Sequence, residues 1–297
     1  KYYGIKNDTK YKETVYYTLS KYNNIITIDS NNEYNTLEFV VKKNNSKNKN
    51  YDVTIDPGHG GMDGGASAYG YSERDFTFQI SKKVKSNLEK AGITVKLTHD
   101  EGDIDKNHVM DEYNKGGRAV IPNEVKSKYT FSIHINKSGS SKVKGIELYT
   151  PSDINYDLVK DIVNNITSNT SLGCSSNKVY KEFDGIYTHN FTESEVKSAI
   201  DGYDEKNYKH YNVTTKSNYL YMIRETGGFM TGAYIDSSNP DKVGVNPYYD
   251  SNIGNESYLL ELGYISNSTD VNTLKEEQDA LAKAISDSII KEINEKM

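Results

Sequence analysis

Apolar positions follow two alternating periods from about residue 51 onward. A compact apolar run at 53–55 predicts a strand. After it, one apolar residue in every four marks one face of a helix, at Phe76, Ile80, Val84 and Leu88. Further apolar runs predict strands at 93–97, 129–135, 145–149 and 258–265. Strands that alternate with helices predict an α/β fold, a mainly parallel twisted sheet with helices on both faces.

The same four-residue spacing predicts two more helices. One is centred on 158–166, and the other is a C-terminal amphipathic helix over 281–293, preceded by capping residues at 268–270. For the helix that carries Phe76, Ser72 is the expected N-cap and Gly92 the expected end.

Two stretches follow the periodic rules less closely. We expect a polar helix over about 105–128 that ends or kinks near Pro122, because proline removes a backbone donor. The stretch 180–257 is polar and rich in Gly, Asn and Tyr. Within it, the apolar run at 219–224 predicts a strand.

The first fifty residues form a separate predicted segment. Two β-type runs, 25–28 and 37–41, flank a polar turn region and predict a short β-hairpin. The polar run 42–50 predicts a linker. We therefore expect an N-terminal extension over 1–50 and a main domain over 51–297.

Composition excludes several classes of protein. The length of 297 residues allows a full hydrophobic core. A net charge of −6 without a strongly basic half argues against nucleic acid as a partner. No apolar run reaches the eighteen residues of a transmembrane segment. The chain begins at Lys1 without a methionine, so we expect any signal segment to lie outside this sequence.

Four polar residues stand at the edges of apolar elements. His59 lies in a glycine-rich turn after the first strand, Glu73 comes just before a helix, and His134 and Glu261 fall within predicted strands. Ligands bind at the carboxyl ends of parallel strands, where these residues would meet. Two histidines and a carboxylate suit a catalytic zinc ion, and a further carboxylate suits its general base. The single cysteine excludes zinc sites built on several cysteines.

Each residue also has an ordinary role. His59 could be a hydrogen-bonding loop residue, and His134 a buried strand histidine. Glu73 could support a helix N-terminus, where a carboxylate contributes about 0.3–1 kcal/mol. The four other histidines lie in polar stretches and are expected at the surface: His99, His108, His189 and His210.

Glu261 is the most informative of these residues, because it interrupts an apolar strand. A buried carboxylate needs a partner. That partner would be either a metal-bound water or an arginine in a structural salt bridge, such as Arg118 or Arg224.

Four motifs carry the candidate residues, in this order: Ile55–Ala66 (IDPGHGGMDGGA), Ser72–Asp75 (SERD), Phe131–Asn136 (FSIHIN) and Leu259–Tyr264 (LLELGY). In type and order they resemble the zinc-dependent N-acetylmuramoyl-L-alanine amidases of the amidase-3 type, which are peptidoglycan hydrolases. The resemblance covers about 51–296. It implies the amidase-3 α/β fold and an insertion at about 180–257, where the family has a shorter connection.

The resemblance also implies the roles of the candidate residues. His59, Glu73 and His134 would be the ligands of one Zn²⁺ ion, and Glu261 would be the catalytic general base. A zinc-bound water, with its pKa lowered to about 7, would be the nucleophile. The bond cut would be the amide between N-acetylmuramic acid and L-alanine. Thr98-His99-Asp100 departs from the family, which commonly has an arginine at the position of His99.

The implied partner is peptidoglycan, with an activator protein as a second candidate, and the implied location is extracellular, at the cell wall. Two alternatives share the same residues. One is another zinc hydrolase, such as a peptidase or a sugar deacetylase. The other is a cell-wall-binding module that is inactive or depends on an activator.

Overall fold

The computed structural model describes residues 24–28, 39–43, 50–100, 116–152, 154–201, 214–226 and 255–296. The chain divides into two compact units after residue 50. In the first unit, β1 (Asn24–Ile28) pairs with β2 (Phe39–Lys43) in antiparallel register. The two strands coincide approximately with the β-type runs that the sequence predicts at 25–28 and 37–41.

The second unit is built on a seven-stranded sheet. The strands, in spatial order, are β6 (Val95–Leu97), β3 (Val53–Pro57), β7 (Tyr129–Asn136), β11 (Glu256–Tyr264), β8 (Glu147–Tyr149), β10 (Ile186–Tyr187) and β9 (Lys181–Phe183). The first four strands of this order are mutually parallel, whereas β8 is antiparallel to β11 and β9 is antiparallel to β10. The sheet is therefore mainly parallel, as predicted. A small hairpin of β4 (Ser67–Ala68) and β5 (Tyr71–Ser72) leads into the first helix.

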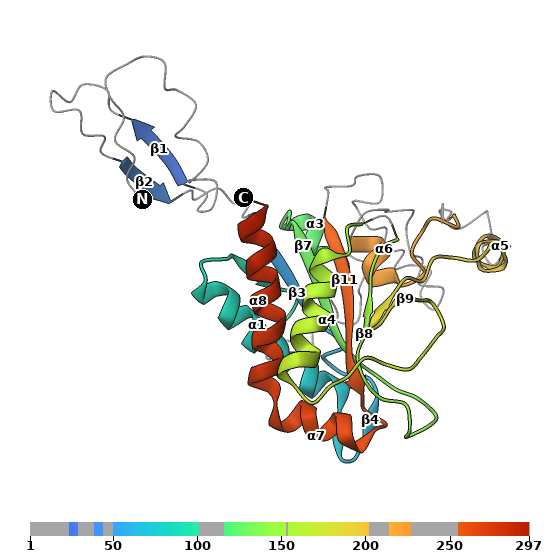
Figure 1. Cartoon of the computed structure of the whole chain (residues 1–297). Coiled ribbons are helices and arrows are strands. Elements are labelled where there is room, and N and C mark those ends of the chain that lie inside the picture. The colour runs from blue at the N-terminus through green and yellow to red at the C-terminus, as the bar shows by residue number, and fades with distance from the viewer. Residues whose placement is uncertain are drawn as a thin grey trace. The chain divides into compact units, whose positions relative to one another are not determined.

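Three long helices cover one face of the sheet. They are α1 (Glu73–Lys90), α4 (Asp157–Asn169) and α8 (Gln278–Glu295), with α8 packed against both of the others (Figure 1). Their apolar stripes join the strands in the main hydrophobic core. Shorter helices are α3 (Ile121–Glu124), α5 (Glu193–Asp201) and α7 (Ser268–Glu276).

The helix α6 (Tyr221–Thr226) covers the opposite face of the sheet. It packs on β11, where Leu259 joins Met222 and Ile223 in a second apolar cluster. The next residue of the strand, Leu260, belongs to the main core. Successive strand residues point to opposite faces, so the sheet has helices on both sides.

Two predicted elements differ from the structure. The run at 219–224 is mostly helical, because a short buried apolar run fits a helix as well as a strand and here contacts the sheet through Met222 and Ile223. The C-terminal segment forms two helices, since Asn267 caps α7 through its side chain and the chain breaks at Glu277 before α8. The residues at 268–270 therefore begin a helix of their own.

The region around Pro122 also needs correction. The expected helix over 105–128 lies partly outside the described residues, and within them only the short α3 forms. Pro122 stands in its first turn, where the missing backbone donor costs little. The helix α1 begins and ends as predicted, with Ser72 at its N-cap and Gly92 directly after its C-cap.

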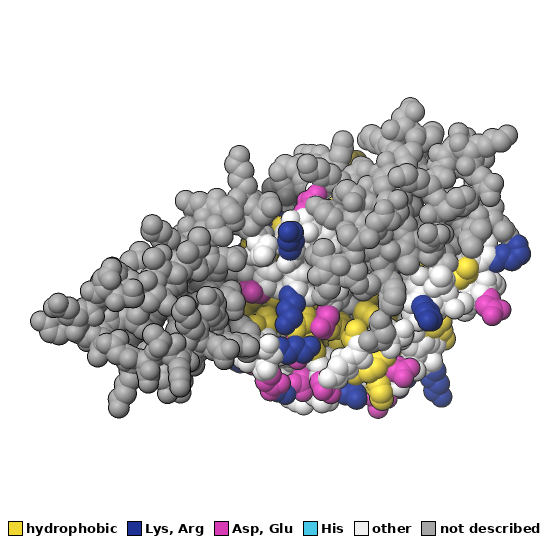
Figure 2. All heavy atoms as spheres, turned by 90° about the horizontal axis from the view of Figure 1, so that it is seen from above, with side chains coloured by type: hydrophobic (Ala, Val, Ile, Leu, Met, Phe, Trp, Pro, Cys, Tyr) yellow, Lys and Arg dark blue, Asp and Glu magenta, His cyan; other side chains and the backbone are white. Residues whose placement is uncertain are grey.

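The surface features agree with the composition. In the view of Figure 2, the described part shows basic and acidic side chains interspersed around a band of apolar ones. Charges of both signs are therefore mixed on the described part of that face. None of the helices within the described ranges is long and apolar enough to cross a bilayer.

Candidate metal centre

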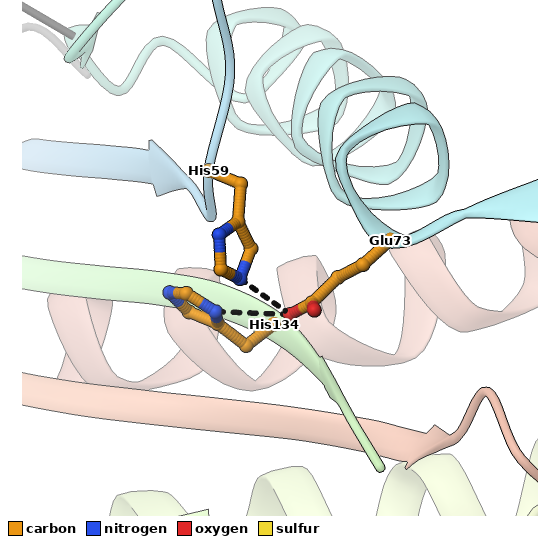
Figure 3. Close-up of side chains that lie close together, drawn as sticks. All are labelled: His59, Glu73 and His134. Carbon is orange, nitrogen blue, oxygen red and sulfur yellow. Dashed lines mark hydrogen bonds and ion pairs between the residues drawn. The ribbon is translucent and has the colours of Figure 1, made fainter. Parts of the chain in front are cut away.

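The first candidate residue, His59, is held in a strained turn after β3. Its backbone has a φ of 64°, in the left-handed region. Its Nδ1 lies 2.7 Å from Oδ2 of Asp63, whose Oδ1 accepts the backbone N–H of Gly65 at 2.9 Å. Because a carboxylate only accepts, His59 donates through Nδ1 and turns Nε2 toward Glu73, at 3.1 Å from Oε1 (Figure 3).

The helix α1 fixes the same turn from the other side. Thr77 donates its hydroxyl to the carbonyl of Gly58 at 2.8 Å, and Arg74 donates to the carbonyl of Gly61 at 2.6 Å. These contacts position the turn against the helix whose first residue is Glu73.

Glu73 is buried, and both oxygens of its carboxylate accept hydrogen bonds. Oε2 accepts the backbone N–H of Ala66 at 2.9 Å, and Oε1 accepts that of Ile135 at 3.0 Å. The same Oε1 lies 3.1 Å from both His59 Nε2 and His134 Nδ1. The carboxylate thus connects β7 to the turn after β3.

His134 comes from β7 and is also buried. Its Nε2 has no hydrogen-bond partner within the described structure. A Cβ at Gly58 would lie 2.6 Å from this ring, and a Cβ at Gly65 would lie 2.6 Å from the ring of His59. The glycines of the turn therefore provide the space that the two imidazoles fill.

These three side chains could hold a metal ion. One potential ligand atom from each lies within 4.8 Å of the others, and the three side chains point toward one another (Figure 3). Two imidazoles and a carboxylate are zinc-type donors, and Asp63 gives His59 the orienting hydrogen bond typical of metal-binding histidines. Nδ1 is the nitrogen of His134 that faces Glu73, and the donor set of the three side chains fits a zinc ion.

The charges in the cluster depend on one another. Burial opposes protonation of His59, but the hydrogen bonds and charges of Glu73 and Asp63 outweigh it and raise the pKa of His59 to about 9. Burial would raise the pKa of Glu73, yet the two histidines hold it well below its usual range. Without a metal, the site is therefore an ion-pair cluster.

Glu261 lies next to this cluster in the sheet. It is paired with His134 across β7 and β11, so the two side chains point to the same face. Its Oε2 is buried and has no hydrogen-bond partner, and burial, followed by the charges of Glu73 and Glu147, raises the pKa of the carboxyl well above its usual range. No ion pair to Glu261 occurs among the residues that the structure describes.

The salt-bridge alternative for Glu261 is therefore not what the structure forms. Arg118 pairs with Asp56 through Nε at 2.8 Å and Nη2 at 2.9 Å, and Arg224 pairs with Glu225 at 3.0 Å.

Asp56 itself was not singled out by the sequence, although it stands three residues before His59 in the same motif. It is completely buried in β3 and also accepts the hydroxyls of Ser132 at 2.6 Å and Thr98 at 2.7 Å. Burial would raise its pKa, but Arg118 and the hydroxyls hold it well below the usual range. The sequence signal that could have identified Asp56 is an acidic residue at the end of the apolar run 53–55. A second buried acid, Glu147 in β8, was also missed.

Two of the remaining histidines are buried rather than exposed. His99 lies with Nε2 2.9 Å from the carbonyl of Pro57 and stacks on Phe78, and His189 is stacked between Tyr180 and Tyr219. His108 and His210 lie outside the described residues. His99 also lines a cavity of about 280 Å³ beside the turn that carries His59.

Comparison with known proteins gives a consistent family assignment. Residues 53–291 match a family model described as N-acetylmuramoyl-L-alanine amidase. An endolysin of Bacillus phage SPP1 is 39% identical over 98 residues, which cover 33% of this chain and 32% of that protein. The probable cell wall amidase LytH of Staphylococcus aureus is 32% identical over 116 residues, 37% of this chain and 35% of that one. The match thus spans about a third of the length of these relatives.

Solved structures show the same fold. The N-acetylmuramoyl-L-alanine amidase AmiC2 of Nostoc punctiforme superposes with a TM-score of 0.52 at 24% identity, over 82% of this chain and 96% of that one. The catalytic domain of CwlV from Bacillus (Paenibacillus) polymyxa var. colistinus gives 0.52 at 23% identity, over 82% and 97%.

Proposed function

The chain belongs to the N-acetylmuramoyl-L-alanine amidase family, and we propose that it hydrolyses the amide between N-acetylmuramic acid and L-alanine in peptidoglycan. One observation carries the proposal. Three zinc-type donors from a turn, a helix and a strand meet beside a carboxylate whose buried oxygen has no partner. The names of the relatives, an endolysin and a probable cell wall amidase, support a cell-wall substrate.

We propose that His59, Glu73 and His134 hold one zinc ion. When bound, the ion would supply Lewis-acid chemistry, activating water and polarising the amide carbonyl. Asp63 keeps the proton of His59 on Nδ1, which would leave the lone pair of Nε2 available to bind the metal ion. The backbone donors of Ala66 and Ile135 fix the orientation of Glu73.

Glu261 is the proposed general base. The attacking water must lose a proton as it adds to the carbonyl carbon, and the leaving nitrogen of L-alanine must gain one as the C–N bond breaks. A single carboxylate can accept the first proton and deliver the second. Glu261 suits this task because Oε2 is free of hydrogen bonds and its raised pKa favours holding a proton.

For the chain as a whole, we propose that 51–297 forms the catalytic domain, that 180–257 is an insertion within it, and that 1–50 is an accessory extension. The proposed place of action is the cell wall, outside the cell. The helix α6, which belongs to the insertion, covers the face of the sheet to which Glu261 points.

The decisive experiment uses zinc-loaded protein on purified peptidoglycan and measures new amino-terminal L-alanine. We expect release by the native protein and by Glu256→Gln, a matched change at the far end of the same strand, but at least a hundredfold less by Glu261→Gln. Released acetate would instead indicate a sugar deacetylase, and other new amino termini a peptidase. Binding of peptidoglycan and zinc without any cleavage would indicate a binding or activator-dependent module and would contradict the proposal for the chain alone.

A further inference from the structure

A row of residues crosses four strands of the sheet at the level of the candidate metal centre. The backbone N–H of Gly58 donates to the carbonyl of Ile133, next to His134. His134 pairs with Glu261 across β7 and β11, and Glu261 pairs with Glu147 across β11 and β8. Paired residues point to the same face, so two carboxylates lie side by side beyond His134.

Glu147 has no exposed surface, yet hydroxyl and amide donors surround it. Tyr264 donates its hydroxyl to Oε1, Tyr149 donates its hydroxyl to Oε2 at 2.8 Å, and the side-chain amide of Asn136 donates to Oε2 at 3.3 Å. No cation contacts it in the described part of the chain. A buried carboxylate is unfavourable unless it is hydrogen-bonded, and these three donors provide that compensation.

A β-bulge brings one of these donors to the row. Between Glu261 and Tyr264, β11 advances by three residues while β7 advances by two, from His134 to Asn136. The extra residue returns Tyr264 to the face of Glu261. The bulge depends on Gly263, with a φ of 96°, and on Asp270, which accepts the backbone N–H of Tyr264 at 2.9 Å.

The contrast between the two carboxylates is the central observation. Glu147 is bonded to three donors, whereas Oε2 of Glu261, its neighbour across the strand pair, has none. The two tyrosine hydroxyls lie on the face of Glu261, and both remain protonated donors because burial and Glu147 raise their pKa values. A carboxylate that accepts such hydrogen bonds is a weaker proton acceptor.

We propose that Glu147 is a positioning residue that engages the hydroxyls of Tyr149 and Tyr264 and thereby leaves the carboxylate of Glu261 free to take up a proton. The inference rests on the proposed function, because it concerns the general base of that reaction. It assigns Glu147 no contact with substrate or metal.

The test compares Glu147→Leu with the triple variant Glu147→Leu/Tyr149→Phe/Tyr264→Phe. In the single variant the hydroxyls lose their acceptor and turn to Glu261. We expect kcat to fall about tenfold to a hundredfold, with KM and zinc affinity unchanged within about threefold. Removing both hydroxyls in the triple variant is expected to restore kcat at least threefold over the single variant. Glu256→Leu, which also removes a carboxylate from a tyrosine hydroxyl on β11, is the control and is expected to keep kcat.

A crystal structure of zinc-loaded Glu147→Leu gives a readout that does not depend on turnover. We expect a tyrosine hydroxyl within hydrogen-bond distance of Glu261. The inference is overturned if both hydroxyls stay away from Glu261, if kcat is unchanged, if zinc binding is lost in proportion to kcat, or if the triple variant is no better than the single one. If the native protein releases no L-alanine, the proposed function fails, and the crystal structure still decides the role of Glu147.

Discussion

At the scale of single residues, the space beside His134 depends on a glycine. A Cβ at Gly58 would lie 2.6 Å from Nδ1 and Cε1 of the His134 ring, closer than real contacts allow. We therefore expect Gly58→Ala to displace the ring and to lower zinc affinity about tenfold or more, measured by competition with a chelator. Gly139→Ala is the control, since a Cβ there meets nothing within 4 Å. Equal zinc affinity in both variants would contradict this account of the turn.

A second residue acts on the site without being a candidate ligand. Asp63 orients His59 through a 2.7 Å contact with Nδ1. Asp63→Asn keeps an acceptor but loses the charge, and we expect zinc affinity to fall about 10–100-fold. Asp75→Asn provides the comparison, because Asp75 is exposed, accepts the hydroxyl of Ser72 at 2.6 Å and lies 3.6 Å from Nε of Arg74, away from the histidines of the site. If both substitutions weaken zinc binding equally, the orienting role of Asp63 is wrong.

The sequence indicated the candidate residues but not their supports. His59, Glu73 and His134 stand in short motifs, and the structure brings all three together. Asp63 belongs to one of those motifs, but its contact depends on the left-handed backbone at His59, which no periodicity encodes. Glu147 escaped notice because its partners come from β7, β8 and β11, and only the sheet register brings them together.

At the scale of elements, the spacing of apolar residues correctly predicted the long helices and the strands of the parallel core. The apolar stripe of α1 lies where one residue in four predicts it, and every strand of the parallel core coincides with a predicted apolar run. The order of strands was not predictable in the same way, since neighbours in the sheet are distant in sequence. The short apolar run at 219–224 failed because its length does not distinguish a buried helix from a strand.

Among the strands, we expect β3 to be especially sensitive to substitution, because it carries Asp56. Its carboxylate joins Arg118, Thr98 and Ser132 without any exposure to solvent. Asp56→Asn removes the buried charge that Arg118 and the two hydroxyls bind, so we expect this substitution to lower the free energy of unfolding by about 3–5 kcal/mol at pH 7. Urea unfolding measures this change, and a loss under about 1 kcal/mol would show that the network contributes little.

The same carboxyl predicts how stability depends on pH. The folded pKa of Asp56 lies below the unfolded value of 3.8, so its stabilisation is fully present above that value and is lost as pH falls toward the folded pKa. Between pH 5 and pH 3, the free energy of unfolding of the native protein should therefore fall more steeply than that of Asp56→Asn. Parallel curves for the two proteins would rule out Asp56 as a source of acid sensitivity.

At the scale of the molecule, the candidate metal centre joins segments that are far apart in sequence. The turn after β3, the first residue of α1 and the C-terminal part of β7 meet at the carboxylate of Glu73. In the metal-free state, protonated His59 and the ionised Glu73 attract each other, because the pKa of His59 is raised to about 9 and that of Glu73 is lowered. The fold therefore does not depend on zinc to avoid repulsion within the cluster, and we expect the metal-free protein to stay folded.

Zinc should nevertheless stabilise the whole domain. A ligand at one hundred times its Kd adds about 2.7 kcal/mol, which corresponds to roughly 5–11 °C in Tm for a domain of this size. We expect the thermal transition of chelator-treated protein to rise by that amount on adding zinc, in differential scanning calorimetry. Glu261→Gln should show the same rise, because Glu261 is proposed as a base and not as a ligand, whereas His134→Ala should show almost none. A zinc-dependent rise that survives in His134→Ala, or disappears in Glu261→Gln, would mean that the metal is held by a different set of residues.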